Sequence, residues 1–115
     1  MLEQQVEHAT MELVAVLRAS ETYQEYQNQL ERIKEQPELF EKVNTFRMKN
    51  FRLQNAAGEG EISAGHLSDQ MEELDREYEE LTMIPLADDF LKAETSFCRM
   101  MQDMNMHIIR NLEFQ

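Results

Sequence analysis

The chain has 115 residues, a formal net charge of −12, and only three glycines, two prolines and one cysteine. This charge disfavours direct binding of RNA or DNA, whose phosphates are also negative. One cysteine excludes an intrachain disulfide and fits the reducing cytoplasm, and no apolar run approaches the roughly 18 residues of a membrane span. The length predicts a single domain over residues 1–115, and the scarcity of glycine and proline favours an all-α fold.

The charge is distributed unevenly along the chain. Residues 37–57 carry four basic and two acidic side chains, whereas residues 58–89 carry one basic and eleven acidic ones. Residues 90–115 are balanced, with three of each sign. A basic segment followed by a strongly acidic one predicts that the two pack side by side.

The first two predicted helices cover residues 2–19 and about 21–35. Ser20 lies between them and is a candidate N-cap for the second. Gln36 precedes Pro37, and a residue before proline avoids the helical conformation, so the second helix should end there. Apolar residues at helical spacing give the first helix one face, made of Val6, Ala9, Leu13, Val16 and Leu17.

A third helix is predicted over residues 37–57, with Pro37 in its first turn. Leu39, Val43, Phe46 and Leu53 share one face of this helix. The polar residues Arg47, Asn50 and Gln54 lie within the same apolar arc, which is unusual. Either their stems pack while their heads reach the rim, or Arg47 is buried and paired.

The three glycines between residues 58 and 65 predict a loop that reverses the chain. Ser63 or Ser68 would cap the next helix, which should end near Pro85. Its apolar residues have the 4-3-4-3 spacing of a coiled-coil-like hairpin: Leu67, Met71, Leu74, Tyr78 and Leu81. Its outer face is acidic. That face is either simply solvated or a docking surface for a basic partner.

The last and longest helix is predicted over residues 86–112. Its apolar face consists of Phe90, Phe97, Met101, Met104, Ile108 and Leu112. Glu94 lies inside this face, as Arg47 does on the third helix, so we expect the two opposite charges to meet within a chain or across a dimer. The stripe is longer than residues 1–84 can cover, which predicts a dimer or larger assembly.

Motifs for catalysis or cofactor binding do not stand out in the sequence. The three histidines, His8, His66 and His107, lie on separate predicted elements. The methionine run from Met100 to His107 could bind copper, but three of its methionines belong to the core stripe. We therefore expect a non-enzyme without cofactor or metal. The alternative is a small-molecule or metal-binding helical bundle with a cavity lined by Tyr23, Tyr26, Arg47 and Glu94.

Several stretches together resemble the YlbF/YmcA family of small helical bacterial proteins. They are the Leu-Arg-Ala-Ser-Glu-x-Tyr turn (17–23), Phe46-Arg47 with Leu53-Gln54, Gly60-Glu61-Ile62, and Ala93-Glu94. The resemblance implies an all-helical, oligomeric, non-catalytic regulator of competence, sporulation and biofilm formation. Some members form a complex that assists an RNA-degrading enzyme and has been linked to iron–sulfur clusters.

These observations predict a bundle of about five helices with a long C-terminal helix, acting in the cytoplasm as a dimeric adaptor. Its partners would be a second copy, other family members or an RNA-decay enzyme, with no contact to nucleic acid or membrane. The predicted interaction residues are Arg47, Asn50, Gln54, Glu94, Phe97, Met101, Met104 and Ile108.

Overall fold

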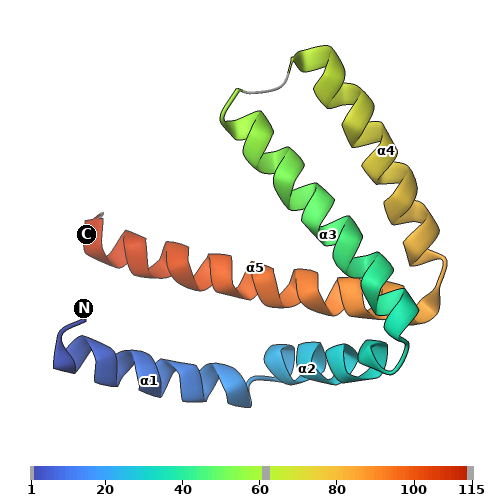
Figure 1. Cartoon of the computed structure of the whole chain (residues 1–115). Coiled ribbons are helices and arrows are strands. Elements are labelled where there is room, and N and C mark those ends of the chain that lie inside the picture. Colours follow the sequence, from blue (N-terminus) through green and yellow to red (C-terminus); the bar gives the residue numbers. More distant parts are fainter. Residues whose placement is uncertain (1, 61–62, 114–115) are drawn as a thin grey trace. The chain divides into compact units, whose positions relative to one another are not determined.

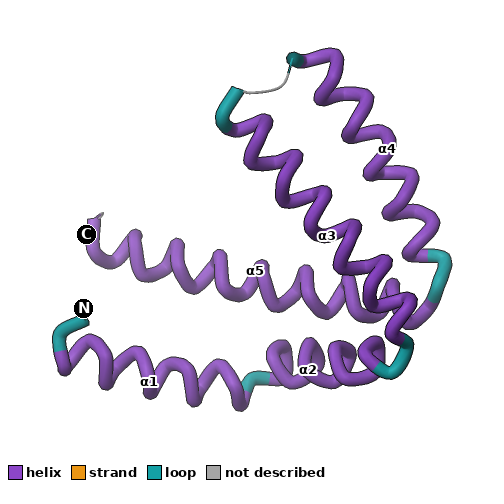
Figure 2. Tube along the Cα trace, viewed as in Figure 1, coloured by secondary structure: helices purple, strands orange, loops and turns teal. Residues whose placement is uncertain are grey.

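The computed structural model describes residues 2–60 and 63–113, and these residues form five α-helices joined by short turns (Figures 1 and 2). The prediction of an all-α fold with five helices and a long last helix is confirmed. The helices are α1 (Gln4–Ala19), α2 (Glu21–Lys34), α3 (Pro37–Gly58), α4 (Ala64–Thr82) and α5 (Pro85–Glu113).

The helix boundaries follow from local backbone chemistry. The Ser20 hydroxyl accepts a hydrogen bond from the Tyr23 amide at 3.2 Å and donates one to the Leu17 carbonyl at 2.6 Å. One side chain therefore satisfies both the last turn of α1 and the first turn of α2. Pro37 and Pro85 each stand at the first position of a helix, where the missing N–H costs no hydrogen bond.

The loop between α3 and α4 is shorter than the three glycines predict. Gly58 ends α3, and Gly65 lies in the first turn of α4. Of the residues that the structure describes, only Gly60 has a positive φ, of 73°. Ser63 is the N-cap of α4 and accepts from the His66 amide at 3.4 Å, whereas Ser68 lies within the helix. The Glu61 and Ile62 positions of the predicted loop motif lie outside the described residues.

The helices belong to two compact units. Unit 1 is Met1–Glu31 with Phe90–Gln115, and unit 2 is Arg32–Asp89. The boundary between them lies within α2 and within α5 and not at a loop. The single-domain organisation expected from the length of the chain stays a prediction.

In unit 1, α2 packs against α5 through aromatic side chains. The rings of Tyr26 and Phe97 are stacked, with centroids 5.2 Å apart and planes 15° apart. Tyr23 meets Phe97 edge-on at 5.5 Å, and Tyr26 lies 6.0 Å from Phe90. Phe90 is completely buried. These contacts pair the first half of α5 with α2, and α1 (Gln4–Ala19) has no buried residue.

In unit 2, α3 and α4 form an antiparallel hairpin (Figure 1). Leu53, Leu74 and Leu81 are buried in it, and the rings of Phe46 and Tyr78 lie 5.9 Å apart. The basic segment therefore packs beside the acidic one, as its charge predicts.

The predicted coiled-coil seam of α4 is only partly covered. Leu74 and Leu81 are buried and Leu67 is half-buried, whereas Met71 is 51% exposed and Tyr78 is 44% exposed. Periodicity identifies the face of the helix correctly but overestimates its burial. Leu67, Leu74 and Leu81, which are seven residues apart, are at least partly covered, whereas Met71 and Tyr78, also seven apart, lie on a more exposed edge of the face. Among the described residues, none of the helices has both the length and the apolar character that crossing a membrane requires.

Candidate protein-interaction site

The second half of α5 carries an apolar stripe that continues beyond its contacts with α2. Met101 and Met104 are half-buried, Ile108 is 43% exposed and Leu112 is 78% exposed. Burial thus decreases steadily along the helix after Phe97. A row of large apolar side chains that becomes exposed turn by turn is typical of an interaction surface.

The first helix, α1, has a similar apolar face. Leu13 and Leu17 are half-buried, while Val6 is 47% exposed and Val16 is 67% exposed. Both helices belong to unit 1, and we call the apolar residues of their two faces, taken together, the terminal stripe. It consists of Val6, Leu13, Val16, Leu17, Met101, Met104, Ile108 and Leu112.

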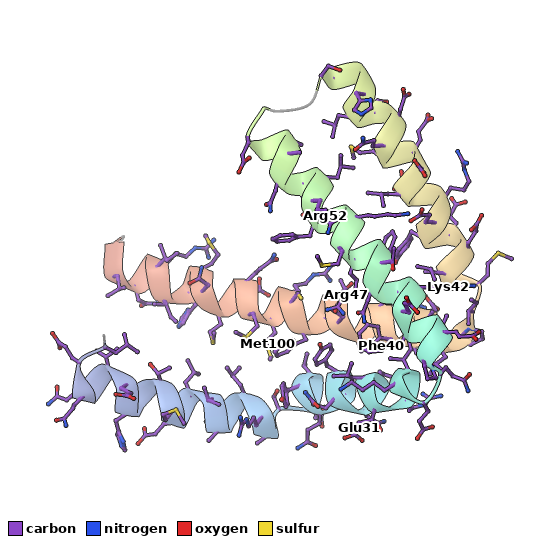
Figure 3. The ribbon with its side chains drawn as sticks, viewed as in Figure 1. Glu31, Phe40, Lys42, Arg47, Arg52 and Met100 are labelled. Atoms are coloured by element: carbon purple, nitrogen blue, oxygen red, sulfur yellow. The ribbon has the colours of Figure 1, made fainter. Side chains whose placement is uncertain are left out.

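The polar row of α3 is distributed between the interior and the surface. Arg47 and Asn50 are half-buried, and Gln54 is exposed (Arg47 is labelled in Figure 3). The Arg47 Nη1 donates a hydrogen bond to Asn44 Oδ1 at 2.8 Å, one turn earlier in the same helix. The interaction role assigned to these three residues stays a prediction.

Glu94 lies in α5 of unit 1, whereas Arg47 lies in α3 of unit 2. Glu94 is half-buried, and its Oε2 atom is fully shielded from solvent. The predicted arrangement, in which the carboxylate and the guanidinium meet, stays a prediction.

Two of the residues proposed for a ligand cavity, Tyr23 and Tyr26, have a packing role in unit 1. Tyr23 and Tyr26 both pack their rings against Phe97, and the Tyr23 hydroxyl accepts a hydrogen bond from Gln27 at 2.9 Å. Packing of α2 on α5 accounts for the positions of both rings. The binding-module alternative therefore gains no support from the two tyrosines.

Metal ligands are also scattered in the described part of the chain. Residues 2–60 and 63–113 contain no group of three or more His, Cys, Asp or Glu side chains that could hold a metal ion. Met100 is half-buried on α5 (Figure 3), while Met106 and His107 are exposed. Cys98 is exposed on the same helix.

Sequence reasoning missed the ion pair between Lys49 and Glu77. The Lys49 Nζ lies 2.9 Å from Glu77 Oε1, which links α3 to α4 across the hairpin. The hydrogen bond and charge of Glu77, with a smaller contribution from Glu73, raise the pKa of Lys49 above 10.5. The charge pattern indicated that α3 and α4 would pack, but only the register of the two helices identifies which charges meet.

The comparison with family models decides the relationship of this chain to known proteins. The model described as control of competence regulator ComK, YlbF/YmcA, matches residues 6–113. The chain belongs to the YlbF/YmcA family. The match covers α2 to α5 and all but the first two residues of α1, so the resemblance inferred from short motifs is confirmed over nearly the whole chain. No curated protein and no solved structure matches it.

Proposed function

We propose that this YlbF/YmcA protein is a non-catalytic cytoplasmic regulator that acts through protein–protein contacts and forms a homodimer through the terminal stripe. The observation that supports the dimer most directly is the exposure of four apolar side chains on one unit of the chain: Val6, Val16, Ile108 and Leu112. The family description, control of a competence regulator, supports a regulatory role. Other family members and an RNA-decay enzyme are the further partners that we propose from this membership.

The charge distribution supports a second copy as the occupant of the terminal stripe. Two chains of net charge −12 repel each other, and the repulsion is greatest where residues 58–89 approach their counterparts. Residues 90–115 carry equal numbers of acidic and basic side chains. A contact through residues 90–113 of α5 therefore brings together a part of the chain with no net charge, and buries apolar surface at the same time.

Light scattering of the purified protein at micromolar concentration tests the dimer. The parent should have a mass near twice the 13.7 kDa of one chain. Ile108→Glu should reduce this mass to that of the monomer, because it places a charge in the stripe. Met106→Glu is the matched control, since Met106 is 47% exposed on the same helix but lies about 200° around it.

A second matched pair tests the contribution of α1. Val16 is 67% exposed and belongs to the stripe, while Met11 is 62% exposed and lies about 140° away around the helix. Val16→Glu should dissociate the dimer and Met11→Glu should leave it intact. A monomeric parent, or equal effects within each pair, would contradict the proposed surface.

The regulatory role is tested by complementation in the native host. After deletion of the gene, Met106→Glu should restore the parental phenotype, and Ile108→Glu should not, although its circular dichroism spectrum stays helical. Full restoration by a monomeric Ile108→Glu variant would show that regulation does not need the dimer. A deletion without any effect on competence, sporulation or biofilm formation would oppose the regulatory role itself.

A further inference from the structure

One side of the α3–α4 hairpin in unit 2 has a groove that the dimer surface does not use. Its larger hollow measures about 730 Å³ and a neighbouring one about 350 Å³. Lys49 and Glu77 line both hollows, so their ion pair spans the groove between the two. Lys42 and Arg52, both labelled in Figure 3, belong to the α3 side of the groove.

The larger hollow combines an apolar floor with acidic walls. Phe46 is half-buried, Leu81 is buried, and Ile84 is 38% exposed at the end of the hollow. The walls contain four carboxylates and two ammonium groups: Glu38, Glu41, Glu77, Glu80, Lys42 and Lys49. Apolar contact area beside an excess of like charge is the pattern of a site for an amphipathic segment of opposite charge.

The ion pair shows that carboxylates at this groove stabilise a bound cation. Lys49 Nζ is held 2.9 Å from Glu77. Its pKa is raised by the hydrogen bond to Glu77, by the negative potential of that carboxylate and, to a smaller extent, by that of Glu73. The same potential extends along α4, because residues 58–89 carry eleven acidic side chains and one basic one. Glu38, Glu41 and Glu80 line the same hollow and would attract additional ammonium or guanidinium groups.

We propose that this groove docks a basic amphipathic helix of a partner protein. Arginine or lysine side chains of that helix would meet Glu41 and Glu80, and an apolar side chain would rest on the floor beside Ile84. The proposal builds on the adaptor function and adds the class of partner. A second copy fits poorly, because the only basic segment of this chain is α3, which already packs on α4. Nucleic acid is repelled by the same carboxylates.

A synthetic peptide tests the charge and shape requirements directly. The probe is a fluorescein-labelled helical peptide of about 16 residues, or four to five turns, with arginines on one flank and leucines on the other. A peptide with glutamates in place of the arginines is its control. Fluorescence anisotropy with the full chain at roughly 0.15 M salt, where surface charges are well screened, should give saturable binding of the arginine peptide only.

Two charge-matched double variants locate the binding. Glu41→Gln with Glu80→Gln should weaken binding by about tenfold or more, because both carboxylates line the groove. Glu72→Gln with Glu79→Gln removes the same charge from acids outside the groove and should change the affinity by roughly twofold at most. Ile84→Ser should also weaken binding, whereas Met83→Ser, at a residue that is 82% exposed and outside the groove, should not.

Each outcome of this experiment bears on the proposal. An equal loss of peptide affinity in the two double variants would indicate diffuse electrostatic attraction and would overturn the proposal. Absence of saturable binding by the parent would overturn it as well. Light scattering on the same samples separates it from the dimer proposal, since Ile108→Glu should still bind the peptide, and the groove variants should still be dimers.

Discussion

The rings of Tyr26 and Phe97 are stacked 5.2 Å apart and connect α2 to the middle of α5. Phe97 also meets Tyr23 edge-on, so one half-buried ring contacts aromatic side chains on two successive turns of α2. Stacked and edge-on pairs of this kind add stability beyond the area that they bury. This cluster is the main contact that we identify between the two long helical segments of unit 1.

We expect Phe97→Ala to destabilise the protein by about 2–4 kcal/mol, since it removes two ring contacts and leaves a cavity. Phe51→Ala is the control, because Phe51 is 62% exposed, and it should cost less than roughly 1 kcal/mol. Urea denaturation followed by circular dichroism at one protein concentration measures both. Similar losses in the two variants would show that the aromatic cluster contributes no special stability.

The hydroxyl of Ser20 provides a second prediction. Ser20→Ala should destabilise the protein by about 1 kcal/mol, because the Tyr23 amide loses its N-cap acceptor. Ser63→Ala should cost less, since its bond to the His66 amide is longer, at 3.4 Å, and exposed. Thermal and urea melts of the two variants check this order, and a larger effect at Ser63 would contradict it.

Replacement of two glycines by alanine should change the stability of the protein in opposite directions. Gly60 has a φ of 73°, and an alanine in this left-handed conformation should cost about 1 kcal/mol. Gly65 lies in the first turn of α4 with no atom within 4 Å of an added Cβ, so Gly65→Ala should stabilise by about 0.5 kcal/mol. Urea melts of the two variants distinguish the signs. Stabilisation by Gly60→Ala would mean that the turn readily adopts another conformation.

Stability at alkaline pH reports on the pair of Lys49 with Glu77. The pKa of Lys49 is raised above 10.5 in the folded chain, so the pair contributes fully below the unfolded pKa. Its contribution is lost as the pH rises through the folded pKa. The parent should therefore lose more stability than Lys49→Gln as the pH rises above about 10.

Glu77→Gln should show the same reduced alkaline sensitivity as Lys49→Gln, because either change removes the interaction. Roughly 1 M salt should reduce the difference in alkaline loss of stability between the parent and these two variants, since the pair is partly exposed and becomes screened. Urea melts over this pH range provide the measurement. Parallel pH profiles for the parent and both variants would show that the ion pair does not affect stability.

The boundaries of the helices were predictable because Ser20, Pro37 and Pro85 act on the backbone beside them. The predicted packing of α3 on α4 was also correct, since opposite net charges on adjacent segments attract. The depth of burial was not predictable. Met71 and Tyr78 have the spacing of buried residues, yet both are exposed, because burial depends on how far the opposite helix extends over each face.

The candidate site shows the same division between local and long-range information. Helical spacing placed Phe97, Met101, Met104 and Ile108 on one face, but it could not show that their burial decreases toward the end of α5. The groove beside Lys49 has no signal in the sequence. It depends on the register between residues 28 positions apart, and spacing within one helix does not determine that register.

Cys98, the only cysteine among these 115 residues, is exposed on α5. A disulfide formed by this thiol must therefore join the chain to another molecule. Under mild oxidation, a covalent dimer on a non-reducing gel would report how closely two α5 helices approach each other in solution. The same thiol accepts one maleimide dye per chain, so energy transfer between labelled copies can follow their association without a second engineered site.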